Sequence, residues 1–252
     1  MKHDFNERCD SSSQTYQYYH CCSFLARLLF RVFCRVHLVI LETPPKEGPS
    51  IIASNHISHF EPALLGGFFP RALDWVAMEE LFQHPLGRWL LKHLHVISMD
   101  RFGKNFAHNR HSLRSILQRL RLGRAVGIFP EGGIRSGEES ILEKAPMKPG
   151  LTMLSFLSQA PVIPCVVLGT DRLYLFKNWL RRPPIWVIIG KAMRPPPKEE
   201  RNNAQARLNF EEKLNSVFPA LQKELYERFQ LTPEDLPKTA AERRGTSIKY
   251  PG

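Results

Sequence analysis

Short apolar runs alternate with amphipathic stretches along the middle of this chain, and this alternation constrains the fold more than any other feature. The apolar runs are rich in β-branched and aliphatic residues, as is typical of buried strands. They cover residues 36–41, 50–54, 73–77, 95–98, 125–129, 162–168 and 185–189. Strands that alternate with helices predict an α/β fold with a largely parallel, mixed sheet flanked by helices.

Four amphipathic stretches supply the predicted helices between and after these strands. They cover residues 79–93, 104–121, 150–159 and 204–229. The apolar side chains of the first stretch are spaced for one helix face, which we expect to contact the core. They are Leu81, Leu86, Trp89, Leu90 and Leu94.

No linker rich in Gly, Ser or Pro divides the 252 residues into two patterned halves. We therefore expect a single sizeable core rather than two small ones, with one folded domain over residues 37–229. We expect residues 1–36 to form an N-terminal polar segment and an amphipathic helix. Residues 230–252 are polar and contain Lys and Arg, and this composition predicts a flexible C-terminal tail.

The amphipathic helix is predicted over residues 23–36, with Ser23 as its N-cap. Arg27, Arg31 and Arg35 recur every four residues and form one basic stripe. An apolar face lies on another side, formed by Leu25, Leu29, Val32, Phe33 and Val36. This pattern is typical of a membrane-associating helix that lies in the lipid interface. The alternative is an ordinary surface helix packed on the core.

Other sequence features indicate where in the cell the protein is found. No run of about 18 apolar residues occurs, so we expect no spanning helix, and the polar first 20 residues do not read as a signal peptide. The five cysteines match no zinc pattern and favour a reducing compartment. Together these features predict a peripheral membrane protein on the cytoplasmic face.

The net charge of +11 suits an anionic partner such as nucleic acid, anionic lipid or a phosphorylated substrate. Charge alone does not choose among these partners. The chain has no helix-turn-helix, zinc-finger or RNP pattern, so we expect no nucleic acid as partner. A Gly-x-Ser-x-Gly nucleophile elbow is also absent, which argues against a serine lipase or esterase.

Three polar loops follow predicted strands, where the chemistry of a parallel sheet collects. The first reads Asn-His-Ile-Ser-His-Phe-Glu-Pro over residues 55–62. His56 suits the role of a general base near neutral pH, and Glu61 could fold back to orient its ring through a short turn into a helix. His59 is a competing base without so natural a carboxylate partner. One His and one Glu are by themselves more typical of a surface His beside a helix-capping acid.

The other two loops carry possible phosphate ligands. Arg101 lies just past one predicted strand and could hold a phosphate through two hydrogen bonds. In the third loop, Gly132 and Gly133 let the backbone approach a ligand and offer N–H groups to an anion, while Arg135 adds charge. Glu131 could bind a substrate hydroxyl or orient an arginine. A surface Asp–Arg pair and a glycine-rich turn are the simpler interpretations of these two loops.

Taken together and in order, these segments resemble the conserved blocks of the glycerolipid acyltransferase family, which includes 1-acylglycerol-3-phosphate acyltransferases. The family's Asn-His-x-Ser-x-x-Asp-Pro is similar to residues 55–62, and its arginine block is similar to residues 97–101. Its Phe-Pro-Glu-Gly block with a following Arg-Ser is similar to residues 129–136, which end at Ser136. Its Val-x-Pro block is similar to residues 161–164. The similarity extends from about residue 37 to residue 191.

This resemblance implies a reaction and its partners. The donor would be an acyl thioester, either acyl-CoA or acyl-carrier protein, and the acceptor lysophosphatidate or a related lysophospholipid at a membrane lipid surface. His56 would be the general base, oriented by Glu61. Acceptor binding would fall to Arg101, Glu131, Gly132, Gly133, Arg135 and Ser136. No metal and no cofactor beyond the thioester co-substrate would be needed.

One residue departs from the family pattern. Glu61 stands where the family has Asp, one methylene longer, although it can still accept a hydrogen bond from an imidazole N–H. This leaves open a reduced rate, a different acceptor such as an ornithine lipid or a lipid A precursor, or an inactive relative. A non-catalytic protein that binds anionic lipid or nucleic acid is the alternative from another class.

Overall fold

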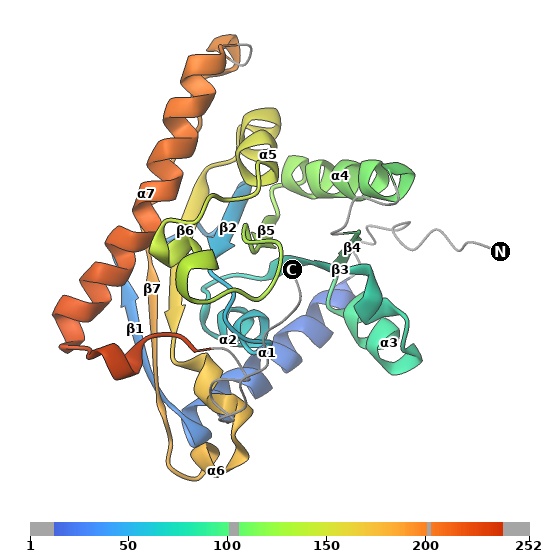
Figure 1. Ribbon diagram of the computed structural model, residues 1–252. Helices are drawn as coiled ribbons and strands as arrows, with labels where there is room; N and C mark the ends of the chain where they lie inside the picture. The colour runs from blue at the N-terminus through green and yellow to red at the C-terminus, as the bar shows by residue number, and fades with distance from the viewer. Residues whose placement is uncertain (1–12, 101–105, 201–202, 239–252) are drawn as a thin grey trace.

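Figure 1 presents the computed structural model of the chain, in which helices lie on both faces of a central sheet. The structure describes residues 13–100, 106–200 and 203–238. Its strands are β1 (Arg35–Ile40), β2 (Ser50–Ser54), β3 (Leu73–Met78), β4 (Ile97–Met99), β5 (Ala125–Ile128), β6 (Val162–Leu168) and β7 (Pro184–Ile189). Its α-helices are α1 (Ser13–Phe33), α2 (Glu61–Phe68), α3 (Pro85–His93), α4 (Phe106–Arg121), α5 (Gly150–Ser158), α6 (Phe176–Trp179) and α7 (Ala204–Phe229). The 3₁₀ turns are η1 (Glu79–Phe82), η2 (Gly137–Glu139), η3 (Ile141–Glu143), η4 (Thr170–Tyr174), η5 (Lys198–Glu200) and η6 (Pro233–Asp235).

The described strands form one sheet in the order β1-β7-β6-β2-β5-β3-β4. Each neighbouring pair is parallel except β6 and β7, which run antiparallel. The prediction of an α/β domain with a largely parallel, mixed sheet is therefore confirmed. The carboxyl ends of β2, β5 and β6 meet at one end of the sheet, which also holds the amino ends of β1 and β7.

Both faces of the sheet are buried, and the alternation of side chains along a strand divides the core in two. On β2, Ile51 and Ala53 belong to a cluster that α4, α5 and α7 cover. Ile52 points the other way, into a cluster with residues of α1 and α2. Every residue of β2 and β6 is buried, which explains why these two runs are continuously apolar or small.

The prediction of one helix over residues 79–93 is wrong. The chain forms η1, then a break, then α3, and Pro85 lies in the first turn of α3. Proline lacks the N–H that would continue the preceding helix, but its fixed φ suits the start of a new one. The helices predicted over residues 104–121, 150–159 and 204–229 correspond to α4, α5 and α7, and the Asn203 side chain caps α7.

The apolar face of this region does not all pack into the core as predicted. Leu94 packs against the second cluster, but Leu81, Trp89 and Leu90 are 44%, 53% and 41% exposed. The side chain of Leu86 lies outside the described part of the structure. Spacing identifies an apolar face of a helix but not what covers it, and here that face is turned outward.

The N-terminal helix differs from its prediction in both length and orientation. It begins at Ser13 rather than at Ser23, whose hydroxyl donates to the Gly66 carbonyl on α2 at 2.8 Å. Arg27 donates through Nε to the Gly67 carbonyl of α2. Its side chain is therefore turned toward the protein and does not belong to a basic stripe that faces lipid. Phe33 and Val36 pack against the second core cluster.

The outward side of α1 is apolar instead. Phe24 is 68% exposed, and Leu25, Leu28, Leu29 and Val32 are exposed as well. We call this surface the apolar face of α1. Within the described residues, no helix is both long and apolar enough to cross a membrane.

The start of the predicted flexible tail is packed onto the domain. Asp235, in η6, forms an ion pair with Arg172 of η4. The Lys238 backbone N–H donates to Asp171 Oδ2 at 3.0 Å. The first part of the predicted tail, residues 231–238, thus contacts the domain through polar groups. Residues 239–252 lie outside the described part.

Candidate active site

Three loops come together at the end of the sheet where β2, β5 and β6 terminate. The loop after β2 carries His56, the loop after β5 carries Glu131, and η4 after β6 begins at Thr170. Asn55 anchors the first loop, because its buried amide donates to the Val167 carbonyl at 2.9 Å and accepts from the Val167 N–H at 2.8 Å. The Asn55 side chain thus pairs with the backbone of β6 as a neighbouring strand would, and this fixes the direction of the following residue, His56.

The predicted contact between His56 and Glu61 is present. Glu61 is the first residue of α2, and its Oε2 lies 2.8 Å from His56 Nδ1. Since a carboxylate only accepts, Nδ1 carries the hydrogen and Nε2 has a free lone pair. No described residue hydrogen-bonds Nε2, and the ring is 13% exposed. The arrangement leaves Nε2 able to accept a proton from a substrate hydroxyl.

Glu61 itself is completely buried and is held by two hydroxyl groups. Ser58 donates its backbone N–H to Oε2 at 2.9 Å and its hydroxyl to Oε1 at 2.6 Å. Thr170 donates its hydroxyl to Oε1. Sequence reasoning missed Thr170, since it lies 109 residues from Glu61 and outside the family blocks. The only signal available in the sequence was its position two residues after a buried strand.

A stack of aromatic rings fixes the other side of His56. The imidazole lies parallel to the Phe129 ring at 4.1 Å, and Phe129 stacks on Trp75 at 5.0 Å. Gly127 on β5 makes room for this stack, because a Cβ there would lie 2.5 Å from Trp75 Cε3. The stack and the Glu61 carboxylate together restrict rotation of the imidazole.

Glu131 is placed differently from its predicted role as a substrate ligand. Its Oε2 accepts from the His56 backbone N–H at 2.6 Å, and its Oε1 accepts from the Ser140 hydroxyl at 2.7 Å and the Ile141 N–H at 3.0 Å. Both oxygens are thus used within the protein. Burial raises the pKa of this carboxyl to about 7, against the opposing effect of its hydrogen bonds. Glu131 ties the His56 loop to η3.

The remaining residues of the third loop surround His56 mainly through their backbone. The Arg135 N–H donates to the His56 carbonyl at 2.8 Å. Gly132 has a φ of +70° and donates to the Phe129 carbonyl, so its N–H closes a turn and is not offered to an anion as predicted. Gly133 and Ser136 are half-buried beside it.

The Arg135 guanidinium projects from this loop and pairs with Glu139 at 2.8 Å. Both side chains are well exposed, and an exposed pair of this kind is weak enough to exchange for a substrate phosphate. Arg101 lies outside the described residues. The residue before it, Asp100, is fixed to α4 by two backbone hydrogen bonds with the Asn109 side chain, each 2.9 Å long.

His59, the competing base, lies on the exposed side of the same loop. Its Nδ1 is 2.7 Å from the Tyr174 hydroxyl, so a phenol and not a carboxylate is its partner. Burial and the neighbouring His56 lower the pKa of its ring. The described residues contain no group of His, Cys, Asp or Glu side chains that could hold a metal ion.

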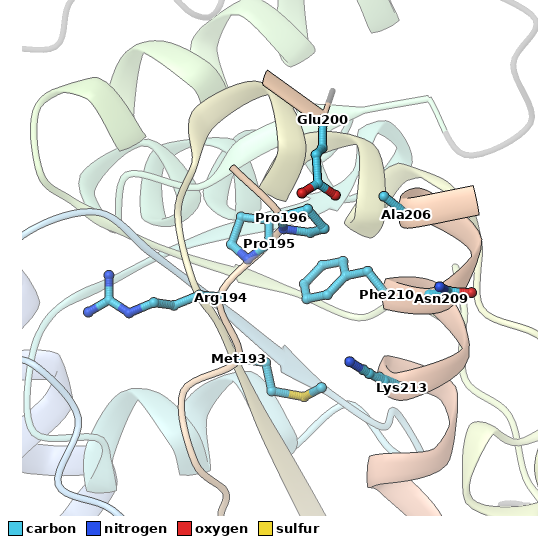
Figure 2. A pocket seen from close by; sticks show the side chains of 9 residues that line it. All are labelled: Met193, Arg194, Pro195, Pro196, Glu200, Ala206, Asn209, Phe210 and Lys213. Carbon is cyan, nitrogen blue, oxygen red and sulfur yellow. The ribbon is translucent and has the colours of Figure 1, made fainter. Parts of the chain in front are cut away.

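The cavity drawn in Figure 2 is not part of this site. It has a volume of about 450 Å³, with Phe210 of α7 facing Pro195 and Pro196. Met193, which also lines it, bridges to Val162 at the amino end of β6. The cavity therefore lies at the end of the sheet opposite to His56.

Comparisons with known proteins agree with this fold. The sequence model of the Acyltransferase family matches residues 35–168 of the chain. The chain therefore belongs to the Acyltransferase family, and it is an acyltransferase enzyme.

Individual relatives narrow the resemblance further. The chain is 25% identical over 176 residues to the 1-acyl-sn-glycerol-3-phosphate acyltransferase of Bacillus subtilis, covering 69% of this chain and 82% of the relative. It is 32% identical over 155 residues to the enzyme of the same name from Pseudomonas aeruginosa, covering 61% and 57%. The 1-acyl-sn-glycerophosphate acyltransferase PlsC of Thermotoga maritima shares the fold, with a TM-score of 0.60, 22% identity and coverage of 86% and 85%.

Proposed function

We propose that this enzyme transfers a fatty acyl group from an acyl thioester to the free hydroxyl of 1-acyl-sn-glycerol-3-phosphate. The observation that carries this proposal is the buried Glu61 carboxylate on Nδ1 of His56, which leaves Nε2 as a base at the edge of the site. The relatives named above, which are acyltransferases for this acceptor, support the choice of substrate.

These positions support the following reaction. The acceptor hydroxyl gives its proton to His56 Nε2 while its oxygen attacks the thioester carbonyl. Glu61 stabilises the imidazolium that forms. Collapse of the tetrahedral intermediate breaks the C–S bond, and the imidazolium proton passes to the departing thiolate. The products are a diacylated phosphate lipid and a free thiol, from either coenzyme A or a carrier protein.

We assign the acceptor phosphate to cations at the rim of this site. The Arg135 guanidinium is the described candidate, and Arg101 is the second by its place in the family pattern. Glu131 acts as a positioning residue, because its oxygens hold the backbone of the loop that carries His56.

The proposed site of action is a membrane surface, to which the protein attaches peripherally. The apolar face of α1 supports this, since a packed surface helix would turn such side chains inward. Trp89 and Leu90 of α3 extend the exposed apolar surface, because the ring of His93 contacts both Tyr18 of α1 and Trp89. The cytoplasmic side, where acyl thioesters are made, remains the predicted side of attachment.

The acceptor assignment is tested by a panel of lipids. Purified protein is given acyl-CoA or acyl-carrier protein together with lysophosphatidate, other lysophospholipids, an ornithine lipid or a lipid A precursor. Thiol release and the acylated product are both measured. We expect lysophosphatidate to be acylated fastest. Faster acylation of another acceptor would reject the proposed substrate but retain the reaction, and no thiol release with any acceptor would reject catalysis.

A further inference from the structure

A basic pocket lies where the end of α1, the start of β1 and the turn before β7 meet. It has a volume of about 350 Å³. Its cations are Arg31, Arg35 and Arg182, and Val36, Leu38 and Phe68 supply apolar walls. The three guanidinium groups come from three segments, since Arg31 is on α1, Arg35 begins β1 and Arg182 precedes β7.

These three arginines lack acidic partners among the described residues. None of them forms an ion pair with a described carboxylate, and no Asp or Glu lines the pocket within the described chain. Arg31 and Arg35 are exposed, and the Arg31 guanidinium lies 5.9 Å from the centre of the Phe68 ring. Three like charges gathered without a counterion favour an anion between them.

Arg182 is fixed at this pocket by the last turn of α1. It donates to the Arg31 carbonyl at 2.8 Å and to the Cys34 carbonyl at 3.5 Å. The end of a helix exposes unpaired carbonyls that repel anions, and Arg182 caps two of them. The guanidinium thus offsets the local negative potential and keeps its remaining N–H groups available to a ligand.

The pocket adjoins the apolar face of α1. Val32 is 51% exposed and is the residue next to Arg31, while Leu28 is one turn earlier and also exposed. A lipid whose acyl chains contact these side chains would carry its phosphate at the height of the pocket. Arginine heads beside apolar side chains are the pattern expected at the boundary between lipid headgroups and acyl chains.

We propose that Arg31, Arg35 and Arg182 form a binding site for the phosphate of an anionic phospholipid in the membrane. This inference rests on the proposed attachment to a membrane surface and identifies the lipid that orients it. The site is separate from the acceptor site, because Phe68 ends α2 and Glu61 begins it. A helix of that length separates the two by about 10–12 Å. The bound phospholipid is therefore a docking lipid and not the substrate.

The test compares vesicles of phosphatidylcholine with vesicles that also contain phosphatidylglycerol. Binding of the full chain is measured by co-sedimentation at about 0.1 M salt, where exposed charges more than one Debye length apart are screened. The variant R31Q/R35Q removes the two exposed cations and leaves the helix-capping Arg182 in place. We expect its affinity for anionic vesicles to fall roughly 10- to 30-fold, and its binding to neutral vesicles to stay unchanged.

The matched control is R121Q/R207Q, which removes the same charge from exposed positions on α4 and α7. Arg121 precedes the amino end of β5, at the end of the sheet opposite to the pocket. The control should keep its preference for anionic vesicles. Equal losses in both variants would show that net charge alone is responsible and would overturn the site, as would no loss in R31Q/R35Q.

A further arm separates a lipid phosphate from a free phosphate. Inorganic phosphate is added to the vesicle assay at constant ionic strength. Little displacement is expected, whereas displacement at low millimolar phosphate that disappears in R31Q/R35Q would assign the pocket to a free anion and overturn the lipid assignment.

The enzymatic proposal is tested separately with lysophosphatidate in detergent micelles, where docking to a bilayer is not needed. R31Q/R35Q should turn over there at the wild-type rate. Failure of the wild-type protein to turn over, with intact binding to anionic vesicles, would reject the proposed function and retain the docking site.

Discussion

At the scale of single residues, the carboxylate that orients His56 depends on a hydroxyl from a distant part of the chain. Thr170 donates to Glu61 Oε1, opposite to the oxygen that contacts His56 Nδ1. Both carboxylate oxygens of Glu61, whose side chain is longer than the Asp of the family, are therefore held by hydrogen bonds. We regard Thr170 as a positioning residue, since it acts on the reaction through Glu61.

Replacement of Thr170 by valine should lower kcat on the order of tenfold, because a buried carboxylate loses one of its donors. KM for lysophosphatidate should change little, and Thr170→Ser should restore the rate. Thr152→Val is the matched control, because that buried hydroxyl on α5 hydrogen-bonds no described residue. An unchanged kcat in Thr170→Val, or an equal loss in the serine variant, would contradict the positioning role.

Glu131 makes stability depend on pH. Its pKa is raised from 4.5 to about 7, so the folded protein holds this proton more tightly than the unfolded chain does. The resulting stabilisation is complete below about pH 4.5 and is lost as the pH rises through about 7. Its size is on the order of 3 kcal/mol.

The measurement is the free energy of unfolding in urea at pH 5 and pH 8, for the wild-type chain and for Glu131→Gln. The wild-type chain should lose more stability over this interval than the variant, which has no proton to release. Equal losses in both proteins would contradict the raised pKa.

At the scale of secondary structure elements, close contact between α1 and α2 depends on one glycine. A Cβ at Gly67 would lie 3.1 Å from the backbone nitrogen of Arg27, whereas a Cβ at Gly66 would meet nothing closer than the Tyr19 hydroxyl at 3.5 Å. The backbone of α1 therefore lies so close to Gly67 that a side chain there would require α1 to shift.

Gly67→Ala should lower the free energy of unfolding by about 1 kcal/mol or more relative to Gly66→Ala, because the first overpacks a helix contact and the second does not. Both variants gain the same helix propensity, so the difference isolates the contact. Chemical unfolding of the two proteins side by side is the measurement. Equal free energies of unfolding for Gly67→Ala and Gly66→Ala would contradict this prediction, because α1 would then move away from the added methyl group at no cost.

The strands of this protein were predictable from sequence to within a few residues, because a strand buried on both faces is continuously apolar over a short run. The contact of His56 with Glu61 was predictable as well. The two residues are only five apart, and the short loop between them leads directly into α2, which begins at Glu61. Local pattern could not reveal Thr170 or the backbone role of Glu131, because these depend on which loops meet at the sheet end. It also could not tell whether the apolar sides of α1 and α3 face the core or the surroundings.

At the scale of the whole molecule, the proposed membrane contact and the reacting groups lie close to each other. α2 begins at Glu61 and packs against α1 near its other end, through Gly66 and Gly67. An eight-residue helix therefore connects the carboxylate to the helix that would lie on the lipid. A lysophospholipid could then reach His56 with its acyl chain still in the membrane.

Replacing Leu25 and Leu29 together with glutamine should weaken binding to neutral phosphatidylcholine vesicles roughly tenfold or more, because apolar contact with the acyl region is lost. The control is the pair Leu122→Gln and Leu208→Gln. These leucines are exposed to a similar degree, but Leu122 lies just after α4 and Leu208 lies on α7. Vesicle co-sedimentation is the measurement. Equal weakening by both pairs would contradict α1 as the attachment surface.

The central claim is that His56 removes the proton from the acceptor hydroxyl. Its most direct test is the single-turnover rate of acyl transfer to lysophosphatidate for the wild-type enzyme, His56→Ala and His59→Ala, with folding checked by urea unfolding. His56→Ala should lose a factor of about 10²–10⁴, and His59→Ala should stay within a few-fold of the wild-type rate. Transfer that survives in His56→Ala and is lost in His59→Ala would contradict the account and assign the base to His59.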